Sequence, residues 1–306
     1  MPSNTTSMLN IIKYYKFWFM VSAVLLIAGI VALVLFGLNL GIDFKGGTLT
    51  QVQFAENVPA LNEIQAVLDQ SNISNSHIQP TGERSVIIRT GPLENDRHQA
   101  MLGALSDKFG SVSEEQYTSI GPIIGKELKS GAIVQLILVS LGIILYIAYA
   151  FRKVTKPVSS WRFGVAAIIA LLHDLLIVIG FFAILGRFKG VEIDSLFVTA
   201  LLTVLGFSVH DTIVVFDRIR ENLRLRTGDS LAEIINNSIN QTLIRSINTS
   251  LTVIFVLTSL LLFGGESIRY FVLALLVGIV AGTYSSIFIA SPMLLVWYNF
   301  DQRRRR

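Results

Sequence analysis

The hydrophobic positions of this chain of 306 residues gather in six long, nearly uncharged stretches. A helix that spans the hydrocarbon core of a bilayer needs about 20 predominantly apolar residues. The six stretches are residues 17–36, 132–151, 163–186, 196–216, 243–263 and 270–298. They predict a polytopic α-helical membrane protein with six transmembrane helices. The first is longer than the apolar core of a signal peptide, so we expect an uncleaved anchor. The last is long enough to be tilted, or to end near Pro292.

Residues 37–131 have a different pattern, in which short periodic segments replace the continuous apolar runs. Period-two alternation predicts four strands, and a period near 3.6 predicts two amphipathic helices. In chain order these elements are a strand at 48–54, a helix at 61–68, strands at 77–79 and 85–90, a helix at 95–109 and a strand at 111–120. This is the order of a small ferredoxin-like α+β domain. Such a domain is more often a binding surface than a catalytic one, and we expect His77 and His98 on its surface.

The placement of Lys and Arg predicts the orientation of the six helices. Fourteen basic residues fall in the N-terminal residues 1–16, the loops 152–162 and 217–242, and the C-terminal residues 299–306, against three in the short loops of the other side. Basic residues accumulate on the cytoplasmic side. Both termini are therefore predicted to be cytoplasmic, and the segment 37–131 to be external.

Composition excludes several classes of function. The chain has no Cys, which excludes disulfides, iron–sulfur ligation and thiolate zinc sites. The segment from Gly121 to Lys126 looks like a phosphate-binding loop, but its spacing is one residue short and Glu127 replaces the required Ser or Thr. We expect a hinge there. The Arg303–Arg306 run is interpreted as a solvated anchor rather than a nucleic-acid site. Nothing in the segment 37–131 resembles the nucleophile–base pair of an enzyme.

Five ionisable residues interrupt the apolar stretches and are the candidate functional residues. They are His173 and Asp174 in the third stretch, His210 and Asp211 in the fourth, and Arg245 in the fifth. Each costs about 2.5–3.5 kcal/mol at the centre of a membrane helix on insertion scales. All five are predicted between the cytoplasmic surface and the midplane, where they can come into contact.

Polar residues at helical spacing accompany these charges. Gln241, Arg245, Asn248, Thr249 and Thr252 form one stripe on the fifth stretch, and Ser208 shares a face of the fourth with Asp211. Because polar side chains cannot favourably face lipid, we expect both sets to line the bundle interior or a wet cavity. The last stretch carries small residues at four-residue intervals, which predict close helix packing. These are Gly278, Gly282, Ser286 and Ala290.

Three interpretations of the buried charges are open. Asp211 and Arg245 can form a static ion pair that holds two helices in register. The two His–Asp pairs can belong to a metal-dependent intramembrane hydrolase, although adjacent helical residues point about 100° apart, so neither dipeptide is expected to form a site alone. A carboxylate beside an arginine can instead titrate and move helices as a proton relay. The physical argument favours the relay.

Two sequence strings are similar to signatures of a known family. Gly41-Ile42-Asp43-Phe44-Lys45-Gly46-Gly47-Thr48 resembles the opening of the external domain of SecD and SecF proteins. Residues 206–222 resemble the fourth-span signature of SecF proteins. The signature residues in this string are Gly206, Asp211, Asp217, Arg218, Arg220, Glu221 and Asn222. His173-Asp174 and Arg245 also match, and the chain is identified as a member of the SecF-type protein-export membrane proteins.

The resemblance implies a non-enzymatic subunit of the Sec export machinery in the bacterial plasma (inner) membrane. Such proteins belong to the resistance–nodulation–division superfamily, pair with SecD and associate with the SecYEG channel. They help to move unfolded exported polypeptides with protons as the coupling ion, without another cofactor, metal or nucleic acid. The resemblance assigns proton movement to Asp211 and Arg245. The family usually has Asn where this chain has His210, which can either join the relay or replace Asn neutrally.

Alternatives to a proton-driven subunit are a structural scaffold of the translocase and a subunit of a small-molecule exporter. One further element is predicted in the loop 217–242. Ser230 and Glu233 form a capping box that opens an amphipathic helix. Its apolar face, made of Leu231, Ile234, Ile235 and Ile239, is expected to lie along the membrane surface or on a partner.

Overall fold

The computed structural model describes residues 9–73, 76–152, 159–225 and 228–304. Lys153, Lys156, Arg226, Arg305 and Arg306, which contribute to the predicted charge bias, lie outside the described residues. The chain divides into two compact units. The α+β unit comprises residues 40–134 and 192–195, and the six-helix unit contains the rest.

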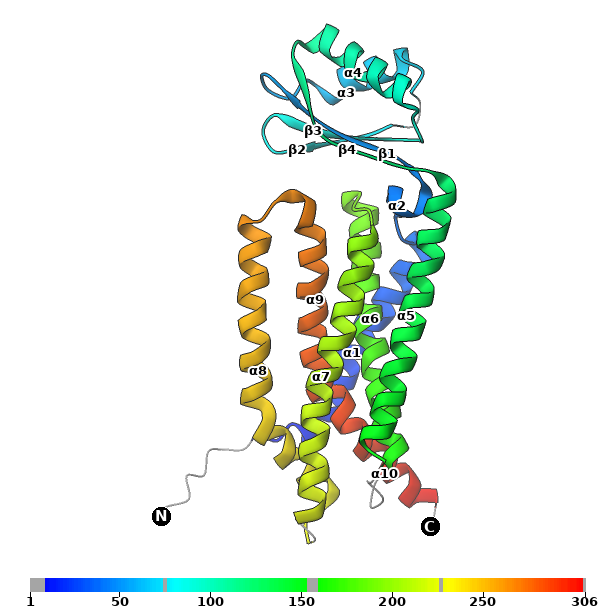
Figure 1. The fold of residues 1–306 in the computed structure, drawn as a ribbon. Helices are drawn as coiled ribbons and strands as arrows, with labels where there is room; N and C mark the ends of the chain where they lie inside the picture. Colours follow the sequence, from blue (N-terminus) through cyan, green and yellow to red (C-terminus); the bar gives the residue numbers. More distant parts are fainter. Residues whose placement is uncertain (1–8, 74–75, 153–158, 226–227, 305–306) are drawn as a thin grey trace. The chain divides into compact units, whose positions relative to one another are not determined.

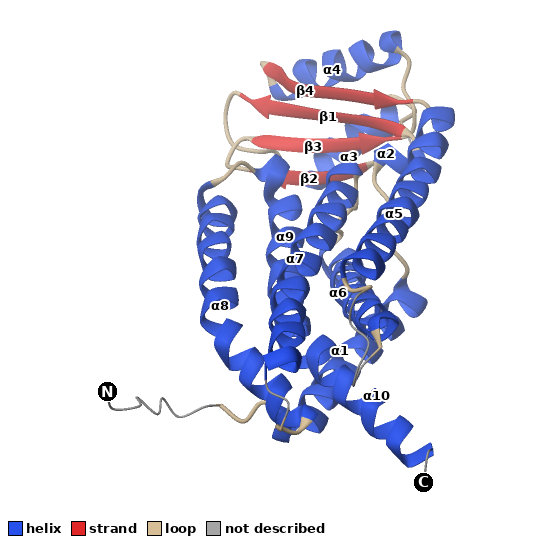
Figure 2. Ribbon diagram, turned by 60° about the horizontal axis from the view of Figure 1, so that its bottom comes forward, coloured by secondary structure: helices blue, strands red, loops and turns tan. Residues whose placement is uncertain are grey.

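The α+β unit has the predicted order of strands and helices. Its elements are β1 (Gly47–Phe54), α3 (Leu61–Gln70), β2 (His77–Thr81), β3 (Ser85–Thr90), α4 (Asn95–Phe109) and β4 (Val112–Ile120), preceded by the short helix α2 (Ile42–Lys45). The sheet order is β2-β3-β1-β4, with every neighbouring pair antiparallel (Figure 2). The split βαβ topology confirms the predicted ferredoxin-like fold.

The core of the α+β unit lies between α3, α4 and one face of the sheet. Alternate residues of β1 and β3 point to this face, and residues three and four apart on the helices point back. The buried apolar side chains are Val52, Phe54, Ile64, Val67, Leu68, Ile73, Val86, Ile88, Met101 and Leu105. The buried side chains of the two helices therefore recur at the helical spacing that predicted these elements.

The surface position predicted for His98 is wrong. His98 is 1% exposed and lies on the same face of α4 as Met101 and Leu105. Its ring packs on Tyr117 of β4 at 4.1 Å between ring centroids, with the Nε2 atom 3.6 Å from a Glu114 carboxylate oxygen. The spacing of His98 and Met101 already placed the imidazole on the buried face. The prediction placed His98 on the surface because histidine is polar, in spite of this spacing. His77 is exposed, as predicted.

Among the described residues, six helices are long and apolar enough to cross a membrane. They are α1 (Tyr15–Phe36), α5 (Pro122–Ala150), α6 (Ser160–Lys189), α7 (Ser195–Leu225), α8 (Leu231–Phe263) and a last span made of α9 (Arg269–Ser285) and α10 (Ser291–Arg304). A 3-10 turn at Ile12–Tyr14 precedes α1, and another at Glu266–Ile268 precedes α9. The long helices run side by side, with α8 at the edge of the unit (Figures 1 and 2).

The helices extend beyond the predicted apolar stretches. α5 begins at Pro122, directly after β4, and α7 continues nine residues past Phe216 to Leu225. α8 begins at Leu231 rather than at residue 243. Polar residues at the helix ends hid these extensions, because a hydropathy pattern reports where a helix is apolar and not where its hydrogen bonds end.

The predicted capping box at Ser230 is present at the start of α8. Its hydroxyl accepts from the Glu233 N–H at 3.3 Å, and the Glu233 carboxylate accepts from the Ser230 N–H at 2.9 Å. The expected location of the amphipathic segment is wrong. Its apolar face is buried in the core of the six-helix unit together with Ile11 and Ile12, so this chain covers that face itself.

Close packing of α9 against α7 depends on two of the small residues identified in the sequence. A Cβ atom added at Gly282 would lie 3.0 Å from Ser208 Cβ, and one added at Gly278 would lie 2.7 Å from Val204 Cγ1. Ser286 and Ala290 are buried further along the same span. Small residues at this interface let the two backbones approach closely, as predicted.

We expect Gly278→Ala to destabilise the six-helix unit. The added methyl group overlaps Val204, and overpacking of this kind costs about 1–3 kcal/mol. The measurement is the midpoint of thermal unfolding in lipid nanodiscs. Gly142→Ala on α5 is the matched control, because a Cβ atom there meets nothing within 4 Å. Equal midpoints for the two variants would contradict the packing argument.

The last span neither ends at Pro292 nor continues as a regular α-helix through it. A π-helical turn, Ser286–Ala290, separates α9 from α10. Proline has no N–H to donate to a helical carbonyl, and the wider turn falls directly before it. The Ser291 hydroxyl donates to the Ser286 carbonyl at 3.0 Å, which satisfies one acceptor in this turn.

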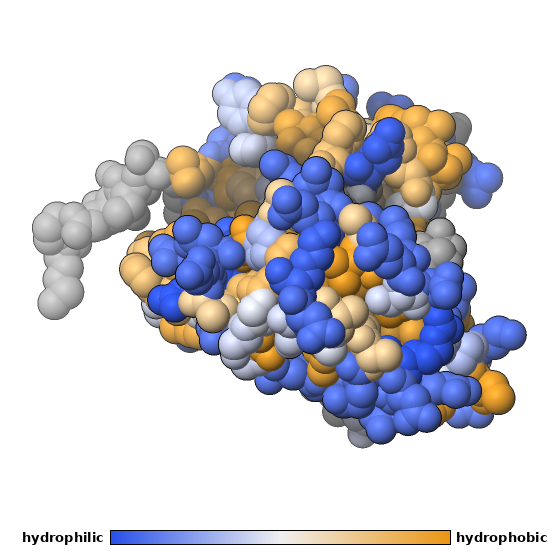
Figure 3. Space-filling model, turned by 90° about the horizontal axis from the view of Figure 1, so that it is seen from above, coloured by the Kyte–Doolittle hydropathy of each residue, from blue (hydrophilic) through white to orange (hydrophobic). Residues whose placement is uncertain are grey.

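Large apolar side chains are exposed along α1, α5 and α8. Examples are Val34 on α1, Leu145 on α5 and Leu262 on α8, each more than 60% exposed. By contrast, the face of the molecule in Figure 3 carries many hydrophilic residues with hydrophobic ones between them. Exposed apolar helix faces of this extent indicate contact with lipid or with a partner.

Candidate functional site

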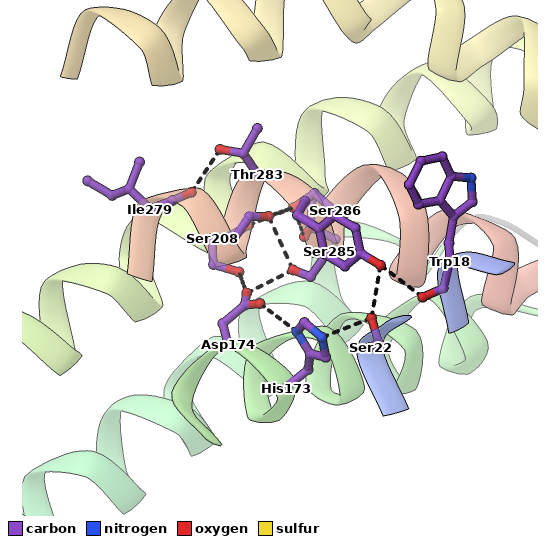
Figure 4. A network of polar contacts seen from close by, with 12 residues as sticks. Trp18, Ser22, His173, Asp174, Ser208, Ile279, Thr283, Ser285 and Ser286 are labelled. Carbon is purple, nitrogen blue, oxygen red and sulfur yellow. Dashed lines mark hydrogen bonds and ion pairs between the residues drawn. The ribbon is translucent and has the colours of Figure 1, made fainter. Parts of the chain in front are cut away.

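Asp174 lies at the centre of a buried hydrogen-bond network in the six-helix unit. It is 1% exposed on α6, which packs against α1 and α9. Its Oδ2 atom accepts hydrogen bonds from the Ser208 hydroxyl of α7 at 2.5 Å and the Ser285 hydroxyl of α9 at 2.8 Å (Figure 4). Three helices therefore converge on one carboxyl group.

His173 is in direct contact with Asp174. The His173 Nδ1 atom lies 3.0 Å from Asp174 Oδ1, and Nε2 lies 3.1 Å from the Ser22 hydroxyl of α1. The Ser22 hydroxyl donates to the Tyr284 hydroxyl at 3.2 Å, which donates to the Trp18 carbonyl oxygen at 2.8 Å. The two side chains bend toward each other despite the angle between their Cα–Cβ bonds, but the network also includes Ser22, Ser208 and Ser285 from other helices, so the dipeptide does not form it alone.

Sequence reasoning missed three members of this network: Ser22, Tyr284 and Ser285. A signal for each was available. Ser22 is the only hydroxyl-bearing residue among residues 17–36, and Tyr284 and Ser285 stand in a polar run within the last apolar stretch. Next to the network, Thr212 and Ser286 pair through their hydroxyl groups at 2.8 Å. Hydroxyl-bearing residues carry no charge and lower the hydropathy of a membrane span only slightly, so a search for ionisable residues does not find them.

Asp211 is a second buried carboxyl group, 5% exposed on α7. Its Oδ2 atom has no hydrogen-bond partner among the described residues, and neither has the nearby hydroxyl of Ser246 on α8. No ion pair joins Asp211 to Arg245 within the part of the chain that the structure describes. The static ion pair considered in the sequence analysis is therefore not formed in this chain.

The polar stripe of α8 lies on the surface of the six-helix unit. Gln241, Arg245, Asn248, Thr249 and Thr252 are all exposed. These residues therefore do not lie in the bundle interior of this chain, whereas Ser208 and Asp211 do. Gln241 and Arg245 line a polar cleft, which is the other position predicted for the stripe. The side chains that α8 turns inward stand one or two positions further on, as in the Ser250 hydroxyl, which pairs with Thr283 at 2.6 Å. His210 is also exposed.

Arg245 lines a polar cleft of about 240 Å³ between α7 and α8. The cleft is lined by Val214, Asp217, Arg218, Glu221, Gln241, Thr242 and Arg245. Arg218 pairs with Glu221 at 2.7 Å and also donates to Gln241. Arg220 pairs with Asp217 at 2.7 Å. Both arginines belong to the basic loop that predicted the orientation, and in the structure each forms an ion pair with an acidic residue three positions away.

Asn222 of α7 forms hydrogen bonds to α8 next to this cleft. Its side-chain amide donates to the Ser238 hydroxyl at 2.8 Å and to the Gln241 side chain at 3.0 Å. Asn222 is buried, so its amide requires partners. Gly206, in the same signature string, meets nothing within 4 Å of an added Cβ atom, and the structure gives no reason for a glycine there.

The glycine pair before β1 has a steric explanation within the α+β unit. Gly46 and Gly47 have φ values of +76° and +142°, which side chains disfavour, and a Cβ atom on Gly47 would lie 2.6 Å from the Thr90 carbonyl oxygen. Gly41 accordingly starts a tightly built segment, with its N–H donating to the Ile193 carbonyl at 2.8 Å. The Asp43 carboxylate accepts from the Ser195 N–H at 2.8 Å and from its hydroxyl.

Metal chemistry finds little support in the side chains of the core network. Both ring nitrogens of His173 are already engaged, one with Asp174 and one with Ser22. Among the described residues, no group of three or more His, Asp or Glu side chains is arranged to hold a metal ion. A hydrolase built on the two His–Asp pairs would also need His210 turned inward, whereas its side chain is exposed.

Six membrane-spanning helices, a ferredoxin-like domain after the first of them, and polar networks inside the bundle define a multi-pass membrane protein of the transport class. The chain matches the family model "Protein export membrane protein SecD/SecF, C-terminal" over residues 101–300 and the "SecD/SecF GG Motif" over residues 31–58. It belongs to the SecD/SecF family of protein export membrane proteins.

Relatives of similar length are SecF proteins. The chain is 50% identical to protein translocase subunit SecF of Thermobaculum terrenum, with 96% of this chain and 95% of the relative covered. Its identity to the same subunit of Anaerolinea thermophila is 42%, covering 97% and 96%. These matches extend through all six helices and the α+β unit.

Longer relatives contain a SecD part as well. Protein translocase subunit SecDF of Bacillus subtilis is 35% identical over 94% of this chain and 38% of its own length. The crystal structure of SecDF from Thermus thermophilus, described as translocon-associated, matches with a TM-score of 0.84 at 33% identity, covering 98% of this chain and 40% of that one. This chain thus spans about two fifths of the SecDF proteins it resembles.

Proposed function

We propose that this chain is the SecF subunit of a bacterial Sec export machinery and uses the proton-motive force to promote polypeptide translocation. The observation that carries the proposal is the pair of buried carboxyl groups, Asp174 and Asp211, inside membrane-spanning helices. Ionisable groups at such depth are costly and are the usual sites of proton relays. The membership of the SecD/SecF family supplies the transport context.

The energy available to such a relay is adequate for moving helices. A membrane potential contributes about 2.3 kcal/mol per elementary charge per 100 mV. Asp211 suits the primary role because its Oδ2 atom lacks a hydrogen-bond partner among the described residues and is therefore free to gain one when the helices move. Arg245 is adjacent in sequence to Ser246, whose hydroxyl lies near Asp211, so a movement of α8 can bring the guanidinium closer to this carboxyl group.

The exposed stripe of α8 supports SecD as the partner of this chain. A stripe that includes Arg245 and Asn248 cannot favourably face lipid, so another protein is needed to cover it. Relatives in which SecD and SecF are fused provide a matching second half. We further propose the SecYEG channel and unfolded exported polypeptides as partners, a non-enzymatic role, and a plasma-membrane location with both termini cytoplasmic.

The function is tested by reconstitution. Inner-membrane vesicles that lack SecD and SecF are supplied with SecD and this chain, and the translocation of an exported protein is measured with and without a protonophore. We expect the chain to raise translocation only when the proton gradient is intact. Equal stimulation with the gradient dissipated would instead assign the chain a scaffolding role.

A further inference from the structure

We propose that His173 and Asp174 together form a second proton-binding site, in which one proton is held between His173 Nδ1 and Asp174 Oδ1. The inference deepens the proposed proton-driven function and rests on it for its role in transport. The protonation of the pair follows from the hydrogen bonds alone. Asp211 remains a separate site, one helical turn from Ser208 on α7.

The direction of each hydrogen bond is determined by the end of the chain of hydroxyl groups. The Trp18 carbonyl oxygen can only accept, so the Tyr284 hydroxyl, 2.8 Å away, donates to it. Tyr284 has then used its single proton, and the Ser22 hydroxyl must donate to it across 3.2 Å. Ser22 has in turn used its own proton. At 3.1 Å, His173 Nε2 must therefore carry a hydrogen and donate to Ser22.

A hydrogen on Nε2 determines what lies on the other side of the ring. In a neutral imidazole with Nε2–H, the Nδ1 atom is a bare acceptor. Asp174 Oδ1 stands 3.0 Å from it, and an ionised carboxylate oxygen is also only an acceptor. Two acceptors at this distance repel each other. One proton must lie between them, either as imidazolium beside carboxylate or as imidazole beside carboxylic acid.

The groups around His173 and Asp174 also indicate that the pair holds one proton. Asp174 Oδ2 already accepts from Ser208 and Ser285, which leaves Oδ1 as the oxygen that shares the proton. The described groups that contact the pair are hydroxyls from α1, α7 and α9, and the only titratable one is Tyr284. Asp211 is the next ionisable side chain buried along α7. No described Lys or Arg pairs with Asp174, so loss of the proton would leave an uncompensated negative charge in a buried site.

The hydroxyl chain also indicates where this proton can leave. On the His173 side the chain ends at the Trp18 carbonyl, a backbone group that cannot pass a proton on. On the Asp174 side it meets Ser208, which shares its face of α7 with Asp211. The other donor to Oδ2, Ser285 of α9, is also bonded to the Gly282 carbonyl oxygen, so its branch likewise ends at a backbone acceptor. A proton that leaves the pair through the network therefore leaves by way of Ser208, and its departure leaves one negative charge on the pair.

The test is solid-state NMR of the full chain in lipid bilayers, with ¹⁵N-labelled His and ¹³C-labelled Asp. The His173 and Asp174 signals are assigned by their loss in His173→Gln and Asp174→Asn, and exposed His77 provides the reference signal in the same sample. We expect Nε2 to be protonated, with either a protonated Nδ1 beside a carboxylate or a bare Nδ1 beside a carboxylic acid. A ring with hydrogen on Nδ1 alone, beside an ionised Asp174, would overturn the proposal.

A second variant keeps the proposal testable independently of transport. In Asp174→Asn the carboxamide can donate to a bare Nδ1, as the carboxylic acid does. We expect this variant to fold, and its His173 ring to be neutral with hydrogen on Nε2. Hydrogen on Nδ1 in this variant would contradict the assigned bond directions. If the spectra agree but translocation proves independent of the proton gradient, the proton site stands and the proposed function falls.

Discussion

Asp211→Asn is expected to abolish the response of translocation to a proton gradient while leaving the fold intact. The carboxamide has nearly the shape of the carboxyl group but can neither bind nor release a proton at physiological pH. Asp211 is buried, and its Oδ2 atom has no hydrogen-bond partner among the described residues, so the substitution removes the site of protonation without breaking a hydrogen bond to that atom. Translocation should fall to the level seen with the gradient dissipated, and proton flux through vesicles containing SecD and this chain should fall in parallel.

The matched control for this variant is Asp229→Asn, which makes the same chemical change at an exposed position between α7 and α8. It should translocate like the parent. Thermal unfolding of both variants separates loss of function from loss of structure. Gradient-driven translocation at the parental rate in Asp211→Asn would show that this carboxyl group carries no coupling proton.

Arg245→Ala is expected to combine a large loss of translocation with almost unchanged stability. The guanidinium is exposed and lines the cleft between α7 and α8, and it forms no ion pair with Asp211. Substitutions at exposed positions of this kind usually change stability by about 0.5 kcal/mol or less. If the stripe of α8 faces SecD, loss of the Arg245 charge weakens the contact between this chain and SecD and does not affect the fold of this chain. The measurements are translocation in vesicles, co-purification with SecD and the thermal midpoint.

Two further variants define the role of Arg245. Arg245→Lys preserves the charge and should retain part of the activity, although without the planar donor fork of arginine. Arg269→Ala removes an exposed arginine paired with Glu266 at 3.6 Å at the start of α9, and should behave like the parent. A stable Arg245→Ala protein with full translocation would remove this residue from the mechanism.

Much of the fold could be predicted because its signals are local. Six apolar stretches, period-two strands and the Ser230 capping box each depend on residues close together in sequence, and all three predictions of element type were correct. Burial was harder to predict. A polar stripe shows that a helix face avoids lipid, but not which molecule covers it, so Asn248 and Thr249 were assigned to the interior of this chain, where the structure has them exposed.

The candidate site was only half visible in the sequence. The charges Asp174 and Asp211 were found because they are costly in apolar stretches. Ser22 and Tyr284 were missed because a hydroxyl group costs little in hydropathy, and because the contacts that give it a role join residues more than 100 positions apart. The direct contact of His173 with Asp174 depends on side-chain rotamers, which the spacing of Cα atoms does not determine.

The π-helical turn Ser286–Ala290 changes the phase of the last span. An α-helix advances about 100° per residue, so the extra residue of the wide turn sets the rotation of everything that follows it. Ser285, before the turn, bonds to Asp174, and Ser286, at its first position, bonds to Thr212, while Leu294 and Leu295 after it remain in the core. Removing one residue from the turn would rotate α10 by about 100° and carry both leucines out of that core. A deletion or insertion in this turn is therefore expected to disturb the core more than a substitution that keeps its length.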